Sequence, residues 1–307
     1  MNILVTGGAG FIGSHIADAY IRAGHRVVVL DDLSTGKIEF VDSKAAFYQM
    51  DVGADEVAEI LEKEKVDVIN HHAAQISVQA SVKDPVADAN ANIIGTLQLI
   101  QKAVKFGVSK FIFASTGGAL YGEQDFFPAT EESRCEPESP YGISKMCVEH
   151  YLRFFAANSG LQPLIFRYSN VFGPRQNPHG EAGVIAIFCH RLNRGKPPVI
   201  NGSGEQTRDY LFIEDLVRAN LIALAPGCSG TYNLGTGREI SVNALAKTLI
   251  HQSGVDIKPQ FGPEKPGEQK RSVLDSGKFQ KKFGWKPEFS FEEGLVKTVR
   301  YFSGEKS

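Results

Sequence analysis

The segment Thr6-Gly7-Gly8-Ala9-Gly10-Phe11-Ile12-Gly13 is the most informative part of this chain. It follows a β-branched run at residues 3–5 and leads into a helical stretch from Ile12 to Ala23. The pattern G-x-G-x-x-G is met by Gly8, Gly10 and Gly13, and Gly7 adds a second register. Glycine permits a tight turn and lets the backbone approach a pyrophosphate, whose charge meets free N–H groups at the helix start. The segment therefore predicts a strand, a phosphate-binding loop and a helix in succession.

A carboxylate stands where a dinucleotide-binding unit needs one. Asp31 follows a second β-branched run, Val27 to Leu30, eighteen residues beyond Gly13. A carboxylate in this place can accept the hydroxyls of the adenine ribose and repels a 2′-phosphate, so NAD is favoured over NADP. The weaker alternative is a glycine-rich turn followed by an aspartate that only caps. Asp51, after a third strand, is a candidate for binding the adenine amino group or is a turn residue.

Working outward, short apolar runs alternate with helical stretches, which is typical of a parallel sheet. The expected strands are Ile3 to Val5, Val27 to Leu30, Phe47 to Met50, Val66 to Asn70, Phe111 to Ala114 and Pro163 to Phe166. The expected helices are Ile12 to Ala23, Glu56 to Lys63, Asn90 to Phe106 and Tyr141 to Asn158. The predicted fold class is α/β, a Rossmann-type doubly wound parallel sheet with a smaller α/β C-terminal substrate-binding region. We expect domains at 1–175 and 176–307, with some later segments returning to the N-terminal sheet.

A hydroxyl pair and a tyrosine–lysine pair are the candidate catalytic groups. Ser115 and Thr116 end the fifth expected strand, and the helix that begins at Tyr141 carries Lys145 four residues later. That spacing puts the phenol and the ammonium on one helix face, where the ammonium can favour the ionised phenol. Such pairs are also common on exposed helices, but open α/β sheets bind ligands at the carboxyl ends of their strands. We therefore predict Tyr141, Lys145, Thr116 and Ser115 as catalytic residues.

Composition excludes several classes of protein. The chain has 33 Lys+Arg and 35 Asp+Glu for a net charge of −2, which argues against a basic nucleic-acid clamp or a polybasic membrane anchor. We find no secretory leader and no run of 18 apolar residues. The four cysteines show neither a C-x-x-C pair nor a metal-binding spacing. We expect a cytoplasmic protein with reduced thiols, no bound metal, and no nucleic-acid or membrane partner.

These motifs together resemble the extended short-chain dehydrogenase/reductases of the NAD-dependent epimerase/dehydratase family. The resemblance spans essentially the whole chain, and its later marks are Arg167 to Arg175, Gln206 to Tyr210, Tyr232 to Gly235 and Lys265 to Glu268. Within the family the chain is most similar to the UDP-glucose (UDP-galactose) 4-epimerases. The resemblance implies that Tyr141 takes the proton of the sugar 4-hydroxyl while hydride leaves C4 for tightly held NAD. The transient 4-keto sugar then turns over, and hydride returns to its other face.

The resemblance also implies which residues bind each ligand. Phe11 and Ile12 would offer N–H groups to the pyrophosphate, and Lys145 would hold the nicotinamide ribose. Other implied NAD-binding residues are Gly7, Gly10, Gly13, Asp31, Asp32, Leu33, Thr35, Gly36, Asp51, Val52, Ala73, Ala74, Asn92, Tyr141 and Tyr168. The implied substrate-binding residues are Thr116, Tyr141, Asn170, Val184, Arg208, Glu268 and Ser272. A homodimer is implied through the helices at 90–106 and 141–158.

Two departures within the family bear on the substrate. Gly117-Gly118 follow Thr116, whereas 4,6-dehydratases carry acidic residues there, so simple C4 epimerisation is favoured. Ser272 lies where sugar-restricted epimerases carry a bulky tyrosine, so our hypothesis is that the N-acetylated UDP-sugars are accepted beside UDP-glucose and UDP-galactose. Alternatives left open are a UDP-uronate 4-epimerase, an NAD(P)-dependent keto-sugar reductase, and a nucleotide-binding module without catalysis. A role in galactose metabolism is expected.

Overall fold

A computed structural model describes residues 1–179, 183–264 and 269–304, and the chain forms two compact units. The first unit comprises Met1–Leu120, Pro137–Arg167 and Val217–Tyr232. The second unit comprises Tyr121–Glu136, Tyr168–Leu216 and Asn233–Ser307. The sequence predicts one boundary near residue 175 and the return of some later segments to the N-terminal sheet. In the structure, residues 121–136 belong to the second unit and residues 217–232 belong to the first.

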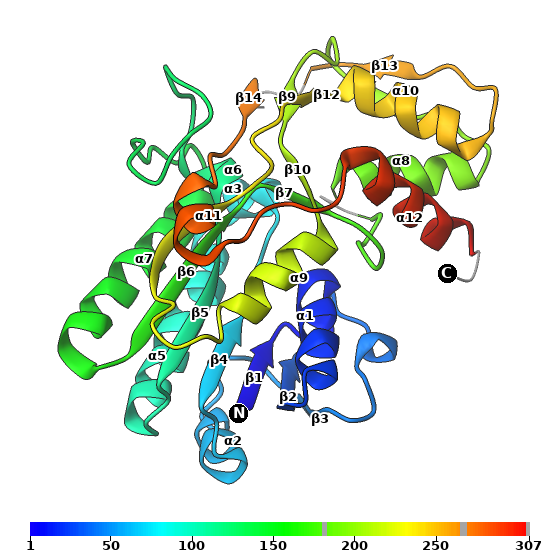
Figure 1. The fold of residues 1–307 in the computed structure, drawn as a ribbon. Helices are drawn as coiled ribbons and strands as arrows, with labels where there is room; N and C mark the ends of the chain where they lie inside the picture. The colour runs from blue at the N-terminus through cyan, green and yellow to red at the C-terminus, as the bar shows by residue number, and fades with distance from the viewer. Residues whose placement is uncertain (180–182, 265–268, 305–307) are drawn as a thin grey trace. The chain divides into compact units, whose positions relative to one another are not determined.

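The first unit is built on a seven-stranded sheet in the order β11-β6-β5-β4-β1-β2-β3 (Figure 1). The strands are β1 (Asn2–Thr6), β2 (Arg26–Asp31), β3 (Ala46–Gln49), β4 (Val68–His71), β5 (Lys110–Thr116), β6 (Gln162–Tyr168) and β11 (Gly230–Leu234). The pairs β1–β2, β1–β4, β2–β3 and β4–β5 are parallel. Strand order changes direction beside β1, with β2 on one side and β4 on the other, which is the topological switch point of a doubly wound sheet. The predicted Rossmann-type fold is confirmed.

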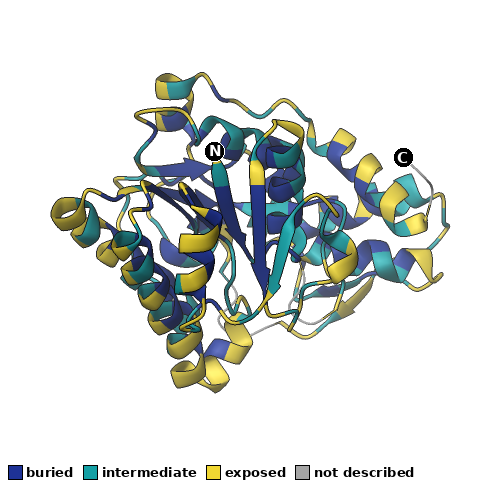
Figure 2. Ribbon diagram, turned by 90° about the horizontal axis from the view of Figure 1, so that it is seen from below, coloured by how far each residue is buried: buried dark blue, intermediate teal, exposed yellow. Residues whose placement is uncertain are grey.

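Helices cover both faces of this sheet. One layer contains α2 (Val57–Glu64), α5 (Gly95–Lys105) and α7 (Pro140–Ser159), and α1 (Phe11–Arg22) lies on the other side (Figure 1). Successive strand residues point to opposite faces. Leu4 and Val28 accordingly join Leu99 and Val148 in one buried cluster. The central strands are mostly buried, whereas the outer surfaces of the helices are exposed (Figure 2).

The predicted helix from Asn90 to Phe106 has an irregular start. It is preceded by α3 (Val78–Lys83) and α4 (Pro85–Ala89), continues through the π-helical turn η2 (Asn90–Ile94), and only then becomes α5. Asp84 caps α4 by accepting a hydrogen bond from the Ala87 N–H at 2.9 Å. A short 3₁₀ turn, η1 (Ile38–Phe40), follows β2, and a short helix, α6 (Gly117–Leu120), follows β5. π-helical turns are rare and often lie at functional sites.

The second unit is a smaller α/β region. Its strands are β7 (Asn170–Phe172), β8 (Val199–Asn201), β9 (Thr207–Arg208), β10 (Tyr210–Phe212), β12 (Ile240–Ser241), β13 (Gln260–Gly262) and β14 (Arg271–Ser272), arranged in one three-stranded and two two-stranded sheets. Its helices are α8 (Val184–Asn193), α10 (Val242–Ser253), α11 (Gly277–Phe283) and α12 (Phe291–Ser303), and α9 (Ile213–Ile222) runs across the boundary between the units. A Cβ atom at Gly294 would lie 2.7 Å from the Phe172 ring, so α12 packs tightly on the strands.

Two further observations concern membrane-spanning helices and the cysteines. Among the described residues, no helix is both long and apolar enough to span a bilayer. All four cysteines are free thiols, with Cys189 and Cys228 buried.

Candidate dinucleotide-binding and catalytic site

The glycine loop between β1 and α1 leaves no room for side chains. Gly7 has φ +66°, and a Cβ atom there would lie 2.6 Å from the amide nitrogen of Ala73. A Cβ atom at Gly13 would lie only 2.2 Å from the carbonyl oxygen of Gly7. The turn is closed by the Gly10 N–H, which donates to that same oxygen at 3.0 Å. The loop therefore needs glycine for its backbone conformation and for the close packing of strand, loop and helix.

The start of α1 is suited to an anion. Gly10 occupies the N-cap position and has no side chain to cap the helix, and the first turn has no acidic residue. The first N–H groups of a helix have no partner within the helix and carry the positive end of its dipole. Phe11 and Ile12 begin this helix, as the implied pyrophosphate contacts require. The compact glycine backbone at Gly7 and Gly13 together with this uncapped terminus fits a dinucleotide pyrophosphate.

Asp31 is fixed at the carboxyl end of β2. Its Oδ2 accepts a hydrogen bond from the Ala9 N–H at 3.0 Å, and its Oδ1 accepts one from the Leu33 N–H at 2.9 Å. Burial, the largest influence, raises the pKa of Asp31, while these two hydrogen bonds act in the opposite direction. Each carboxylate oxygen can accept more than one hydrogen bond. Asp31 thus keeps the capacity to accept ribose hydroxyls while it holds the glycine loop against β2.

The other residues expected around the adenosine form the turn that follows Asp31. Leu33 adopts a left-handed conformation with φ +61°, and Asp32 accepts hydrogen bonds from the N–H and hydroxyl of Ser34. A Cβ atom at Gly36 would lie 2.7 Å from Asp31 Oδ1, so Gly36 also lies beside the carboxylate. Thr35 belongs to the same exposed turn.

Asp51 and Val52 follow β3 and have different surroundings. Asp51 is exposed and accepts the Gly53 N–H at 2.7 Å, which is the turn role considered above. Val52 is buried in the core cluster. Contact of either residue with adenine stays a prediction.

A loop after β4 forms the other wall beside Gly7. Thr6 Oγ1 accepts hydrogen bonds from the N–H groups of His72 and Ala73 at 3.2 Å each, and Ala73 and Ala74 are half-buried. Asn92, on η2, exchanges two hydrogen bonds of 2.9 Å with the backbone of Gln75. Asn92 therefore fixes this loop through its side-chain amide, whose Nδ2 also donates to Asp88, and its direct contact with a cofactor stays a prediction.

Thr116, Tyr141 and Lys145 all belong to the first unit. Thr116 is the last residue of β5, and its Oγ1 accepts the Ala119 N–H at 3.2 Å. Ser139 caps α7 by accepting the Gly142 N–H at 3.2 Å, which fixes the turn that carries Tyr141. Lys145 Nζ lies 5.9 Å from the centre of the Tyr141 ring and donates to the carbonyl oxygen of Ala114 at 3.0 Å. The backbone of β5 thereby orients the ammonium group beside the phenol.

The proton affinity of Tyr141 depends on more than the neighbouring ammonium. Burial, the larger cause, and the negative charge of Asp88 raise the pKa of Tyr141 well above its usual range. Burial also lowers the pKa of Lys145 to about 8, and Asp88 opposes that shift. The raised pKa favours the protonated phenol at neutral pH. An additional positive charge is needed before Tyr141 can act as a base at neutral pH.

Ser115 lies on the opposite side of β5 from Thr116 and takes a different role from the one expected. It is buried, and its hydroxyl donates to Glu149 Oε1 at 2.6 Å. Glu149 in turn forms an ion pair with Arg167 at 2.7 Å, and both side chains are almost completely buried. The structure therefore corrects the catalytic assignment of Ser115, because its hydroxyl serves a buried charge pair and neighbouring strand residues face opposite ways.

Apart from Thr116 and Tyr141, the residues expected to bind the substrate belong to the second unit, as does Tyr168 at the end of β6. Arg208 and Ser272 are directly paired across the parallel strands β9 and β14, and Ser272 is 4% exposed. Asn170 Nδ2 is buried and has no hydrogen-bond partner among the described residues, which is the state expected of a group that awaits a ligand. Val184 begins α8. Glu268 and Lys265 lie outside the described residues.

Sequence reasoning missed the polar residues that brace the catalytic helix. Asp88 accepts a hydrogen bond of 2.6 Å from the hydroxyl of Ser144, and Ser81 Oγ accepts the Tyr141 N–H at 3.2 Å. The one available signal was the spacing of Asp88 and Asn92, which lie one helical turn apart. In the described part of the chain, no cluster of His, Cys, Asp or Glu side chains is arranged to hold a metal ion.

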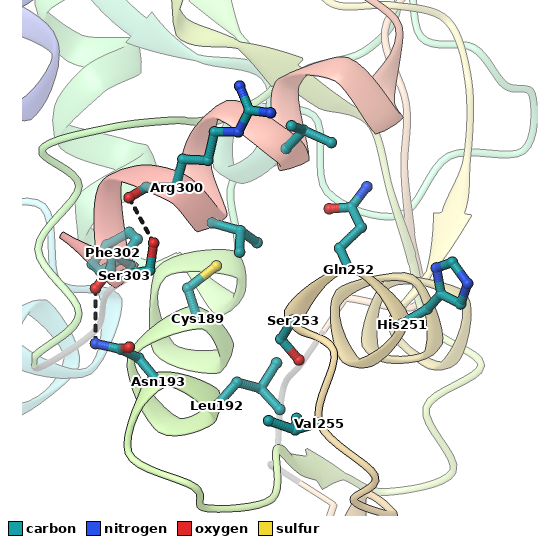
Figure 3. Close-up of a pocket in the computed structure, with 12 residues that line it drawn as sticks. Cys189, Leu192, Asn193, His251, Gln252, Ser253, Val255, Arg300, Phe302 and Ser303 are labelled. Carbon is teal, nitrogen blue, oxygen red and sulfur yellow. Dashed lines mark hydrogen bonds between the residues drawn. The ribbon is translucent and has the colours of Figure 1, made fainter. Parts of the chain in front are cut away.

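A separate hollow in the second unit contains none of the predicted residues. It has a volume of about 580 Å³ and lies among α8, α10 and α12 (Figure 3). Asn193 Nδ2 donates to the carbonyl oxygen of Phe302 at 2.8 Å and so holds the end of α12 on α8. The walls combine apolar side chains such as Leu192 and Val255 with amide and hydroxyl groups, and we assign it no part in the reaction.

Comparison with known proteins agrees with this geometry. Residues 3–235 match the model of the NAD dependent epimerase/dehydratase family. A UDP-glucose 4-epimerase of Mycolicibacterium smegmatis is 41% identical over 98% of each chain. The crystal structure of a UDP-glucose 4-epimerase from Thermotoga maritima with UDP-glucose is 49% identical over 98% of each chain, with a TM-score of 0.96. A UDP-N-acetylglucosamine 4-epimerase from Methanobrevibacter ruminantium is 35% identical over 99% of each chain, with a TM-score of 0.94. This chain belongs to the NAD dependent epimerase/dehydratase family.

Proposed function

We propose that this protein is an NAD-dependent UDP-hexose 4-epimerase that interconverts UDP-glucose and UDP-galactose. The observation that carries the proposal is the position of Lys145 beside Tyr141, on a helix capped and braced in the same unit as the glycine loop and Asp31. Relatives at 41% and 49% identity that bear the name UDP-glucose 4-epimerase support the substrate class.

The residues of the chain supply binding and proton transfer. Gly7, Gly13 and the start of α1 would hold the pyrophosphate of NAD, and Asp31 would hold the adenine ribose. When bound, NAD supplies a reversible acceptor for the hydride at C4 and a positive charge near the phenol. With NAD bound, the epimer would form without net oxidation, because the hydride accepted from one face of C4 would be returned to the other.

Tyr141 is the general base and then the general acid. In its ionised form the phenol oxygen takes the proton of the 4-hydroxyl, and it gives the proton back when C4 is reduced from the opposite face. Lys145 stabilises the phenolate by its charge, and the Ala114 carbonyl oxygen keeps the ammonium in place. The hydroxyl of Thr116 donates a hydrogen bond to the 4-oxygen, and thus replaces part of the solvation lost on binding.

The second unit would bind the UDP part of the substrate. Arg208 has the planar guanidinium that suits a phosphate, and the unpartnered amide nitrogen of Asn170 is a further donor. Ser272, paired with Arg208, is small enough to leave space for an N-acetyl group. The 35% identical UDP-N-acetylglucosamine 4-epimerase supports acceptance of the N-acetylated pair. Glu268 and Val184 remain proposed substrate contacts.

We also propose a homodimer formed through η2 and α7. The exposed apolar residues there are Ile94, Ile143, Tyr151 and Phe154, with Phe154 58% exposed. Apolar side chains grouped on one helix layer favour association with a second copy. Gel filtration with light scattering should give twice the mass of the chain, and Phe154→Lys should shift the protein toward monomer. A monomeric wild type at micromolar concentration would contradict this interface.

Location and pathway follow from the same proposal. A cytoplasmic enzyme is supported by the four free thiols, which reducing conditions preserve. Interconversion of UDP-galactose and UDP-glucose would give the protein a role in galactose metabolism.

A 4,6-dehydratase is the competing activity within the family. Dehydration needs an acid or base near C5 and C6, but α6 begins with Gly117 and Gly118 directly after Thr116. These residues have no side chain for that chemistry.

One experiment tests the proposed reaction. Purified protein is incubated with UDP-galactose without added NAD, and the anomeric proton signals are followed by NMR. The proposal predicts conversion to UDP-glucose, approaching the same equilibrium from either sugar. No conversion, with or without added NAD, would reject these sugars as substrates.

A further inference from the structure

Asp88 is a buried carboxylate that the reaction described above does not use. It lies in α4 and is 1% exposed. Its three hydrogen-bond donors are all neutral side chains: Gln75 Nε2 at 2.8 Å, Asn92 Nδ2 at 2.9 Å and Ser144 Oγ at 2.6 Å. Buried carboxylates are rare and are commonly paired with a cation. A buried charge held only by neutral donors acts electrostatically on the titratable groups around it.

The donors of Asp88 come from the segments that form the site. Gln75 belongs to the loop after β4, whose residue Ala73 lies beside Gly7. Asn92 holds the same loop from η2. Ser144 lies on α7 between Tyr141 and Lys145. Asp88 therefore ties the wall of the cofactor loop to the helix that carries the proton-transfer pair.

Few charges surround Tyr141. Its own helix contributes Lys145, α4 contributes Asp88, and Lys83 of α3 is exposed to solvent. His71 and His72, at the end of β4, stay neutral, because burial lowers the pKa of both, that of His72 to about 3. β5, α6 and η2 carry no charged residue at this end. Apart from Lys145, Asp88 is thus the buried charge bonded to this part of α7 among the described residues, through Ser144. Burial is the larger cause of the raised pKa of Tyr141 and Asp88 adds to it, while at Lys145 the charge of Asp88 opposes the lowering of the pKa by burial.

We propose that Asp88 is a positioning residue whose negative charge keeps Tyr141 protonated until the cofactor's positive charge is present, and whose hydrogen bonds lock α7 to the loop after β4. The proposal rests on the proposed function only in giving Tyr141 a proton-transfer role. Tyr141 would then be able to accept a proton only once NAD is bound. The negative charge of Asp88 would also favour the ammonium form of Lys145.

The Asp88→Asn variant tests the charge while preserving the hydrogen bonds. The asparagine oxygen can accept from Gln75 and Asn92, and its amide can donate to the Ser144 hydroxyl. The protein, saturated with NAD, is titrated by the ultraviolet absorbance of phenolate, and the Tyr141 signal is isolated by subtracting the matching Tyr141→Phe protein. We expect the midpoint of Tyr141 to fall by about one pH unit, the effect of one charge at short range in a protein interior. In the pH dependence of the rate, the rise on the acid side should move to lower pH by the same amount.

Two control variants separate charge from structure. Asp84→Asn removes an exposed carboxylate at the N-cap of the same helix, where asparagine also caps well, and it should leave the midpoint unchanged. Ser144→Ala keeps the Asp88 charge but removes one hydrogen bond, and it should leave the midpoint nearly unchanged. A midpoint unaltered by Asp88→Asn, or shifted equally by Ser144→Ala, would overturn the proposal. If Asp88→Asn does not fold, Asp88→Ser also removes the charge. Because it removes hydrogen bonds as well, its midpoint is compared with that of Ser144→Ala.

The titration can be separated from the proposed activity. It reads the phenol directly and needs no turnover. A shifted midpoint in a protein that does not epimerise UDP-galactose would reject the proposed function alone. Normal epimerisation with an unshifted midpoint would reject the role of Asp88 alone.

Discussion

The ammonium of Lys145 lies 5.9 Å from the centre of the Tyr141 ring and donates its hydrogen bond to the carbonyl oxygen of Ala114, at 3.0 Å. The charge therefore acts on the phenol through space, and the strand fixes its position. This arrangement leaves the phenol oxygen available to a substrate hydroxyl. It also makes the catalytic role of Lys145 dependent on its own protonation state.

The rate should consequently fall at alkaline pH. Burial lowers the pKa of Lys145 to about 8, so the ammonium is present below that pH and is lost as the pH rises through it. Turnover of UDP-galactose should decrease above about pH 8, measured under saturating substrate. Lys145→Arg keeps a charge that does not titrate in this range, so its lower rate should show no such decrease. If the rate of Lys145→Arg decreases above about pH 8 in the same way, the decrease belongs to another titratable group.

Thr116 and Ser115 should separate activity from stability. Thr116→Val is nearly isosteric and removes the hydroxyl beside the substrate oxygen, so kcat should fall by about 100-fold with little change in the melting temperature. Ser115→Ala removes the hydrogen bond to Glu149 and should lower stability by about 2 kcal/mol while kcat per folded molecule is kept. Measurements of kcat and of the melting temperature on both variants test this separation. A catalytic defect in Ser115→Ala without a loss of stability would restore Ser115 as the reacting hydroxyl.

NAD retention should depend on the glycine loop. Gly13→Ala would bring a Cβ atom to 2.2 Å from the Gly7 carbonyl oxygen and should abolish bound NAD, measured after release from the denatured protein. Gly95→Ala is the matched control, because its Cβ would have its closest contact at 3.4 Å from the Val52 side chain and alanine favours a helix. Full NAD content in Gly13→Ala would contradict the assigned loop.

Sugar specificity should depend on Ser272. Ser272→Tyr should selectively abolish epimerisation of UDP-N-acetylglucosamine and leave UDP-glucose turnover within about threefold, because the ring would occupy the space for the acetyl group. Both substrates are compared by kcat/KM. Equal loss of the two activities would refute the size argument.

Much of the first unit could be predicted from local patterns. The strand, glycines, helix and Asp31 lie close together in the sequence, and the spacing of Tyr141 and Lys145 is set by a single helix turn. The hydrogen bond between Ser115 and Glu149 could not be predicted from the sequence, because it depends on how α7 packs on β5. The raised pKa of Tyr141 depends likewise on burial and on the charge of Asp88, both of which are set by tertiary structure. We expected some later segments to return to the N-terminal sheet, but that residues 217–232 belong to the first unit is a long-range arrangement, which the sequence does not specify.

The most direct test of the proposed reaction uses UDP-glucose that carries deuterium at C4. If the C4 hydrogen leaves as hydride to a retained cofactor and returns to the opposite face, the UDP-galactose formed in ordinary water keeps its deuterium at C4, and Tyr141→Phe slows this conversion by at least about 100-fold. Mass spectrometry and NMR of the product give the isotope and its position. UDP-galactose with protium at C4, or deuterium released to free cofactor, would contradict the account.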